Sequence, residues 1–356
     1  MQTPDIHFNV IPNENDTKVA VICLSRPKAL NALNKGMTEA ISHHLKNWRD
    51  DPLIGHVIIT GSTPRAFCAG GDVRAIYAHI MDQDQVAVDA FFKAEYTAHL
   101  DVAEFPKPVI ALGDGLVMGG GAGLAQCCSH FVVSETTRFA MPESAIGLFP
   151  DAGASVFYGR CPRPVALFLG MIGQIIGPAD CLLLGLAHSM TASQNMAELQ
   201  DALIACHTDE IEATLRRFAA DPGPSLLAEQ RPIIDYIFAG DDVSAMAQRA
   251  ADMVRLRDDA LAAEINQAFM TKCPMTMHVF LRLLKIAGAI TEMSEILNLD
   301  YHLAIKMAKR ADFAEGVRAV LIDKSNDAAW QPARLESVTE QMLDDVFNHR
   351  GLAPLR

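Results

Sequence analysis

Six glycines crowd into residues 113–123, directly after a short apolar run, and this cluster constrains the fold more than any other feature of the sequence. The run at 109–112 has the length and composition of a buried strand. Glycines gathered after such a strand indicate that the backbone approaches another group closely or adopts positive φ. A second apolar run at 131–133 and two carboxylates in apolar company, Glu143 and Asp151, follow. Because carboxylates are costly to bury, these two are candidates for chemistry.

The composition is that of a globular protein. The 356 residues can form one large domain or two smaller ones, half of them are apolar and 21% are charged. The net charge of −13 argues against a generic nucleic-acid or anionic-membrane surface, although a local basic patch for a polyanionic small ligand is compatible with it. The eight cysteines show no CxxC and the twelve histidines no HxxxH. We therefore expect neither a disulfide framework nor a metal site.

No targeting or membrane segment is visible in the sequence. The N-terminus has no basic start followed by an apolar region, which a signal peptide requires. The longest apolar stretch, 165–177, is interrupted by glycines and is too short to span a bilayer. We expect a cytoplasmic protein without a membrane partner.

Strand and helix patterns alternate in the first part of the chain. Residues 18–24 and 57–60 have the pattern of strands, and 35–48 between them has helical spacing, which predicts a βαβ unit and a largely parallel sheet. A helix is predicted over 73–100. After about residue 207 the alternation stops and helical patterns dominate. We expect an α/β core at 1–210 and an α-helical C-terminal region at 211–356.

Two glycine-bearing turns, 66–72 and 118–121, suit the stabilisation of an oxyanion. That task needs two convergent backbone N–H donors with no side chain in the way. Gly71 and Gly120 are the natural donors, and the alternative is that these glycines only make tight turns.

Gly113, Gly115 and Gly119 also imitate a dinucleotide-binding fingerprint, but they follow two earlier βα units and their spacing is not the usual one.

Three acidic residues have competing interpretations. Glu143, between Pro142 and an apolar run, should have a raised pKa that suits a base or nucleophile, or it is a solvated turn residue. Asp151 is either a second working carboxylate or the N-cap of a following helix, and the two roles are compatible. Glu95 lies on the predicted helix, where a glutamate is ordinarily exposed.

Basic loop residues could form a local phosphate site. Arg26, Lys28 and Arg65 lie in loops beside the predicted strands, although scattered basic residues are more often only solvated. Asp72 is most simply a cap for the helix that begins at 73. Ser155 is not part of a GxSxG motif, so an α/β-hydrolase triad is not expected.

At six segments the sequence resembles the crotonase (enoyl-CoA hydratase/isomerase) superfamily, and more closely its 3-hydroxyisobutyryl-CoA hydrolase branch. The family's fold, a spiral of ββα turns followed by helices, is what the resemblance implies. It also implies an acyl-CoA substrate and a trimer-type homo-oligomer. The segments are SRPKALNAL at 25–33, RAFCAGGD at 65–72, FFKAEY at 91–96, MGGGAGL at 118–124, FAMPESAIGLFPDAG at 139–153 and DFAEGVRAVLIDK at 312–324.

The resemblance assigns roles to individual residues. It implies that Gly71 and Gly120 form the oxyanion hole and that Glu143 is the acid/base or nucleophilic carboxylate. Asp151 matches the aspartate of the hydrolase branch, and Glu95 matches its substrate-lining glutamate. The remaining matches belong to the CoA-binding surface: Arg26, Lys28, Ala29, Leu30, Ala66, Ala69, Gly70, Asp72 and Gly119.

One departure separates this chain from the hydratases of the family. They place a second catalytic glutamate three residues after the middle glycine of the triplet, where this chain has Gly123. Hydration of a C=C bond would lack half of its acid/base pair. The resemblance therefore implies hydrolysis of a short branched 3-hydroxyacyl-CoA, with no cofactor because coenzyme A is part of the substrate. An anhydride and a general-base mechanism both stay open. A hydratase or isomerase, an NAD-binding oxidoreductase and a non-catalytic acyl-CoA binder are the rival functions.

Overall fold

The computed structural model describes residues 4–13, 17–290, 292–348 and 353–356. Its parallel sheet and helical C-terminal part confirm the predicted α/β class. The chain divides into two compact units that interleave in sequence. The first unit comprises Met1–Asp72, Ala94–Phe139 and Ile176–Ser225, and the second comprises Val73–Lys93, Ala140–Ile175 and Leu226–Arg356. The division at residues 210 and 211 stays a prediction.

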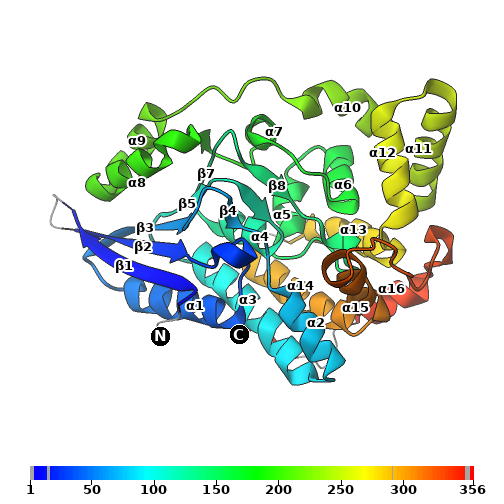
Figure 1. Cartoon of the computed structure of the whole chain (residues 1–356), viewed down its shortest axis with the longest axis horizontal. Coiled ribbons are helices and arrows are strands. Elements are labelled where there is room, and N and C mark those ends of the chain that lie inside the picture. Colours follow the sequence, from blue (N-terminus) through cyan, green and yellow to red (C-terminus); the bar gives the residue numbers. More distant parts are fainter. Residues whose placement is uncertain (1–3, 14–16, 291, 349–352) are drawn as a thin grey trace. The chain divides into compact units, whose positions relative to one another are not determined.

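A six-stranded sheet forms the centre of the first unit (Figure 1). The strand order is β1-β2-β3-β5-β7-β9; β1 is antiparallel to β2 and the other neighbours are parallel. The predicted βαβ unit is therefore confirmed. The strands are β1 (Ile6–Pro12), β2 (Lys18–Leu24), β3 (Ile54–Gly61), β5 (Val109–Gly113), β7 (His130–Val133) and β9 (Ser189–Met190).

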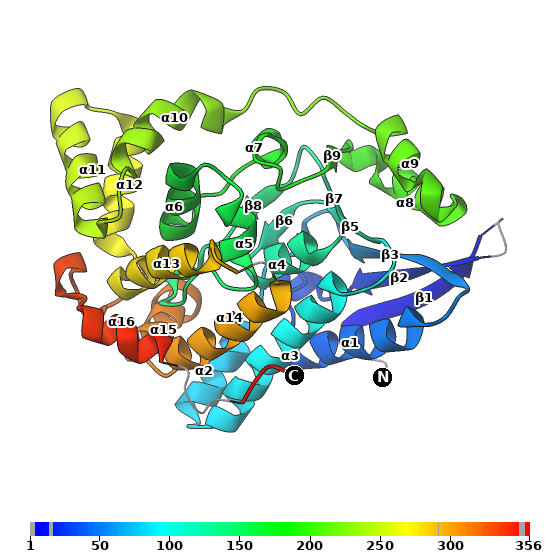
Figure 2. The same cartoon turned by 180° about the vertical axis from the view of Figure 1, so that it is seen from behind.

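Both faces of the sheet are covered by helices. Ile58 and Ile110 of the sheet pack in one core cluster with Leu199 and Leu203 of α8 (Met196–Ala205), which α9 (Ile211–Arg217) extends. Helix α1 (Lys35–Arg49) lies on the opposite face in both views (Figures 1 and 2). Strands buried on both faces read as continuous apolar runs, which explains why they were predictable.

A second, three-stranded sheet in the order β4-β6-β8 was not predicted. Its strands are β4 (Ala66–Cys68), β6 (Leu116–Met118) and β8 (Arg138–Ala140). Three residues are too few to establish a period-2 pattern. Strands β4 and β6 are parallel, with Ala66 opposite Leu116. Helices α4 (Gly120–Cys127) and α7 (Pro178–Leu183) also belong to this unit.

The single helix predicted over 73–100 is wrong. The segment forms α2 (Val73–Met81) and α3 (Gln85–Ala103), with Gln83 between them at φ +58°. A left-handed residue cannot continue an α-helix. The boundary between the two units falls inside α3.

The second unit is mainly helical. Helix α13 is buried on almost all sides, and the ring of Phe280 packs on Gly170 of α6, where any side chain would overlap it. Helices α11 and α12 pack side by side (Figure 2). The remaining helices are α5 (Ala154–Gly159), α6 (Arg163–Ile172), α10 (Leu226–Ile237), α11 (Val243–Arg257), α12 (Ala260–Thr271), α13 (Pro274–Ala287), α14 (Met293–Ala308), α15 (Ala311–Val317) and α16 (Glu340–Phe347).

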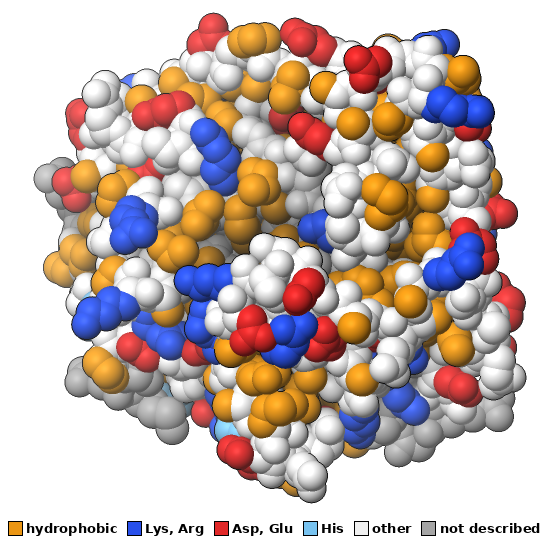
Figure 3. Space-filling view, turned by 45° about the vertical axis from the view of Figure 1, so that its right-hand side comes forward, with side chains coloured by type: hydrophobic (Ala, Val, Ile, Leu, Met, Phe, Trp, Pro, Cys, Tyr) orange, Lys and Arg blue, Asp and Glu red, His pale blue; other side chains and the backbone are white. Residues whose placement is uncertain are grey.

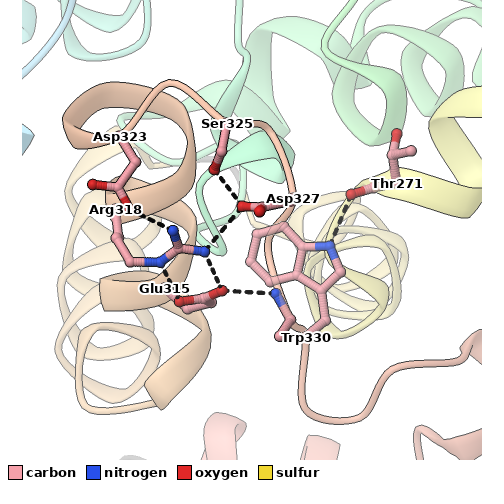
Figure 4. Close-up of polar contacts among 8 residues, drawn as sticks. Thr271, Glu315, Arg318, Asp323, Ser325, Asp327 and Trp330 are labelled. Carbon is pink, nitrogen blue, oxygen red and sulfur yellow. Dashed lines mark hydrogen bonds and ion pairs between the residues drawn. The ribbon is translucent and has the colours of Figure 1, made fainter.

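A network around Arg318, the first residue of a short π-helix (Arg318–Ile322) after α15, fixes the irregular chain that follows this π-helix (Figure 4). The guanidinium donates to Glu315 Oε1 at 2.8 Å, to Asp323 Oδ2 at 2.5 Å and to Asp327 Oδ1 at 3.1 Å. Trp330 Nε1 donates to the carbonyl oxygen of Thr271 at 2.8 Å. Charge-assisted bonds of this kind give a loop a defined path without regular secondary structure.

Among the residues described here, none of the helices is both long and apolar enough to cross a membrane.

Candidate active site

The two predicted glycine turns meet in the first unit. Each follows one of two adjacent parallel strands, β4 and β6, so both turns lie at the same edge of the small sheet. Gly70 adopts φ +112°, and the position of its missing Cβ is 3.7 Å from the nitrogen of Gly120. The missing Cβ of Gly120 would lie 3.4 Å from the nitrogen of Gly71. The structure therefore brings these residues together, and only glycine allows so close an approach.

The amide N–H groups of Gly71 and Gly120 make no hydrogen bond to any part of the chain that the structure describes. Gly120 is the first residue of α4, where an N–H has no partner within the helix. The turn around Gly71 is held on both sides by Leu33, whose N–H donates to the Gly70 carbonyl oxygen and whose carbonyl oxygen accepts from the Asp72 N–H, each at 2.8 Å. Two fixed, adjacent and available donors are what an oxyanion hole requires.

Helix α3 places two side chains against Gly120. Glu95 is only 4% exposed, unlike the exposed glutamate that its helical position suggested. Its carboxylate occupies the space that a side chain on residue 120 would need. One turn later, His99 Nε2 lies 2.9 Å from the Gly120 carbonyl oxygen. Since a carbonyl oxygen only accepts, Nε2 carries the proton, and burial lowers the pKa of His99 to about 4.

His99 was not predicted as a site residue. The spacing offered one signal, because His99 follows Glu95 by four residues and the two must share a helix face.

The segments expected to bind coenzyme A also lie together. The N–H of Ala69 donates to the Leu30 carbonyl oxygen at 3.0 Å, which joins the loop after β2 to the turn after β4. Arg26 donates to Asp72 Oδ2 at 2.9 Å, so part of its charge is neutralised within the protein. Lys28 is exposed, and no ion pair within the described part of the chain involves it. The face in Figure 3 carries lysine and arginine side chains among acidic ones, so the net negative charge does not make the surface uniformly negative.

The second unit carries the two predicted carboxylates. Glu143 opens a short 3-10 helix, and its carbonyl oxygen accepts from the N–H groups of Ile146 at 3.0 Å and Leu148 at 3.1 Å. The residue is 6% exposed, so the alternative of a solvated turn glutamate does not hold. Gly147 adopts φ +73° and packs directly on the backbone of Asp312. The loop that carries Glu143 is thus fixed by α15.

Asp151 is 5% exposed and is not a helix cap. Helix α5 begins at Ala154 and its N-cap is Gly153, so the N-cap interpretation of Asp151 is wrong. The chain instead turns sharply, with Ala152 at φ +52° and Gly153 at φ +83°. The N–H of Ala154 donates to the Asp151 carbonyl oxygen at 2.8 Å. Two consecutive left-handed residues therefore define the path of the backbone directly after Asp151.

A further carboxyl group, missed in the sequence, supports this turn. Asp300 of α14 is 0% exposed, and its Oδ2 accepts from the N–H of Gly153 at 2.8 Å. Burial, and then the charge of Asp151, raise the pKa of Asp300 well above its usual value. One signal was present, because Asp300 lies four residues from both Ile296 and Ala304 and thus on an apolar helix face. Within the described ranges, no group of three or more His, Cys, Asp or Glu residues could hold a metal ion.

Comparisons with known proteins agree on one family. The model of the enoyl-CoA hydratase/isomerase family matches residues 19–347. The mitochondrial 3-hydroxyisobutyryl-CoA hydrolase of Xenopus tropicalis is 38% identical over 94% of this chain and 88% of its own length. The human enzyme of the same name is 33% identical over the same shares. Among solved structures, a carnitinyl-CoA dehydratase from Mycobacterium thermoresistibile has a TM-score of 0.88 and 32% identity, covering 97% of this chain and 96% of its own. An enoyl-CoA hydratase from Rhodobacter sphaeroides has a TM-score of 0.88, 30% identity and 99% coverage of both chains.

Proposed function

Because the chain belongs to the enoyl-CoA hydratase/isomerase family, we propose that it hydrolyses an acyl-CoA thioester, with 3-hydroxyisobutyryl-CoA as its substrate. The curated relatives that match 94% of the chain are hydrolases of that substrate by name. The observation that carries the proposal is the pair of available amide donors at Gly71 and Gly120. Water adds its oxygen to the acyl carbon, the C–S bond breaks, and the products are the carboxylic acid and the free thiol of coenzyme A.

A hydratase is the second candidate, because the two solved structures cited above are a dehydratase and a hydratase by title. Helix α4 has Gly123, buried and without a side chain, where the hydratases of the family carry their second glutamate. Addition of water to a C=C bond needs a proton donor as well as a base. The lack of a carboxylate at 123 therefore favours hydrolysis.

The proposed mechanism gives each predicted site residue a separate role. The N–H groups of Gly71 and Gly120 bind the carbonyl oxygen of the thioester as it becomes negative. Glu143 attacks the carbonyl carbon or takes a proton from the attacking water. Asp151 orients the substrate hydroxyl group or that water, and Glu95 lines the acyl group. The loops at Arg26–Leu30 and Ala66–Asp72 hold the coenzyme A moiety.

Three further expectations stay proposals. Coenzyme A enters as part of the substrate, and we propose no separate cofactor. The relatives are mitochondrial by name, while for this chain we propose a cytoplasmic location. We also propose a homo-oligomer of the trimer type, and neither nucleic acid nor membrane as a partner.

Thiol release from a panel of acyl-CoA esters tests the function. We expect 3-hydroxyisobutyryl-CoA to be cleaved fastest and crotonyl-CoA not to be hydrated. Glu143→Gln should lower kcat by roughly 10²- to 10⁴-fold with coenzyme A affinity retained. Glu198→Gln changes an exposed glutamate of α8 and is the matched control. Full activity of Glu143→Gln, or hydration of crotonyl-CoA without thiol release, would contradict the proposal.

A further inference from the structure

The wholly buried Asp300 has no part in the mechanism proposed so far. It lies on α14, far in sequence from the catalytic segment, yet it accepts the hydrogen bond of Gly153 at 2.8 Å. Its other oxygen, Oδ1, is buried and has no hydrogen-bond partner among the described residues. An ionised carboxylate in such a place would be strongly destabilised. An uncharged carboxyl group fits the observed surroundings.

The charged groups around α14 agree with an uncharged Asp300. Asp151, on the turn before α5, is the charged group that acts on it, and α5 has no ionisable side chain apart from Tyr158. The acids of α15 and α16, which also pack on α14, are engaged with arginines or exposed, and Asp89 of α3 acts on Tyr301 of α14. The acids of α15 and α16 are Asp312 with Arg310, Glu315 with Arg318, Glu340 and Asp344 with Arg282, and the exposed Asp345.

We propose that Asp300 is a positioning residue for the hydrolysis: as an uncharged carboxylic acid, it holds the turn Asp151–Ala152–Gly153 through the amide of Gly153 without adding a second negative charge beside Asp151. The inference rests on the proposed function, in which Asp151 acts on the substrate. The carboxyl group is matched to this task because two neighbouring carboxylates in a buried site cannot both ionise cheaply. The C-terminal helices thus contribute to the position of a catalytic side chain.

Two substitutions separate this role from a merely structural one. Asp300→Asn keeps an oxygen acceptor for Gly153 and has no charge, so kcat should stay within about twofold of the wild type. Asp300→Leu removes the acceptor, and kcat should fall about tenfold or more with KM nearly unchanged, because small displacements of catalytic groups are costly. Asp345→Asn, at an exposed position of α16, is the control. Equal losses in Asp300→Asn and Asp300→Leu, or full activity of Asp300→Leu, would overturn the proposal.

Thermal unfolding of Asp300→Asn tests the charge state without any assay of activity. A raised pKa in the folded protein means that the wild type loses stability as pH rises above the unfolded value of about 4. The melting temperature of Asp300→Asn relative to the wild type should therefore increase from pH 4 to pH 8. A difference that shrinks over this range would show an ionised Asp300 and overturn the inference. If the wild type releases no thiol, the proposed function and the positioning role both fail, whereas the melting curves still report the charge of Asp300.

Discussion

Gly120 is the residue at which the first unit is most constrained. Its N–H is one of the two available donors, its carbonyl oxygen accepts from His99, and its α-carbon faces the carboxylate of Glu95. Three contacts therefore meet at one position, and the contact with Glu95 leaves no room for a side chain there. Gly120 thus serves both the packing of the turn and the proposed stabilisation of the oxyanion.

Gly120→Ala should lower kcat for thioester cleavage. The added methyl group overlaps the buried Glu95 carboxylate, so either that carboxylate or the amide must shift, and loss of one oxyanion donor costs about 3 kcal/mol, or roughly 100-fold in rate. Gly177→Ala, at a position where a methyl group meets nothing within 4 Å, is the control and should keep full activity. Steady-state kinetics of the two variants measure the effect, and full activity of Gly120→Ala would contradict the close fit at this position on which the prediction rests.

His99 should make the protein sensitive to acid. Its pKa is about 4 when folded and about 6.5 when unfolded, so the unfolded chain binds a proton that the folded protein rejects. The free energy of unfolding of the wild type, relative to His99→Gln, should fall by about 3 kcal/mol as pH drops from about 7 to 4. Urea titrations at a series of pH values measure this. Parallel pH profiles for both proteins would contradict a buried neutral His99.

At the scale of elements, the carboxylate segment of the second unit is fixed by contacts between backbones. Gly147 packs on the carbonyl group of Asp312, and the N–H of Cys273 donates to the Ser144 carbonyl oxygen at 3.0 Å. Helices α13 and α15 thereby hold the segment that begins at Glu143. The contact at Gly147 depends on the absence of a side chain, and the hydrogen bond between Cys273 and Ser144 joins main-chain atoms only.

Gly147→Ala should destabilise the protein more than a comparable glycine substitution elsewhere. Gly147 and Gly185 both adopt positive φ, +73° and +68°, but only at Gly147 does a methyl group overlap backbone atoms. We expect Gly147→Ala to cost roughly 3 kcal/mol and Gly185→Ala about 1 kcal/mol, the strain of the left-handed conformation alone. Urea unfolding of both variants decides the matter, and equal costs would show that the Gly147–Asp312 contact is not tight.

The elements also show what the sequence could and could not predict. Strands β2, β3, β5 and β7 were predictable because each is a long or buried apolar run with a strong pattern. Strands β4, β6 and β8 were not, because their pairing is set by tertiary contacts rather than by local propensity. Asp300 escaped because its partner, Gly153, is 147 residues away along the chain. The glycines of the site were identifiable because they cluster after short apolar strands. Its carboxylates Glu143 and Asp151 were identifiable because they lie among apolar residues, where burial of a charge is costly.

At the scale of the whole molecule, the proposed function requires five residues, far apart in sequence, to act on one substrate. Gly71, Glu95 and Gly120 belong to the first unit, and Glu143 and Asp151 to the second. The C-terminal region supplies no reacting group in this mechanism, but it fixes the second unit's share of the site through Asp300 and Asp312. The central claim is that the amides of Gly71 and Gly120 and the carboxylate of Glu143 act on one thioester.

A crystal structure with an acyl-CoA analogue in which a methylene group replaces the sulfur would test that claim most directly. The analogue has the carbonyl group of the substrate but cannot be cleaved. Its carbonyl oxygen should lie about 3 Å from the nitrogens of both Gly71 and Gly120, with the Glu143 carboxylate beside the carbonyl carbon. A carbonyl group bound away from either amide, or one without the Glu143 carboxylate beside it, would contradict the account.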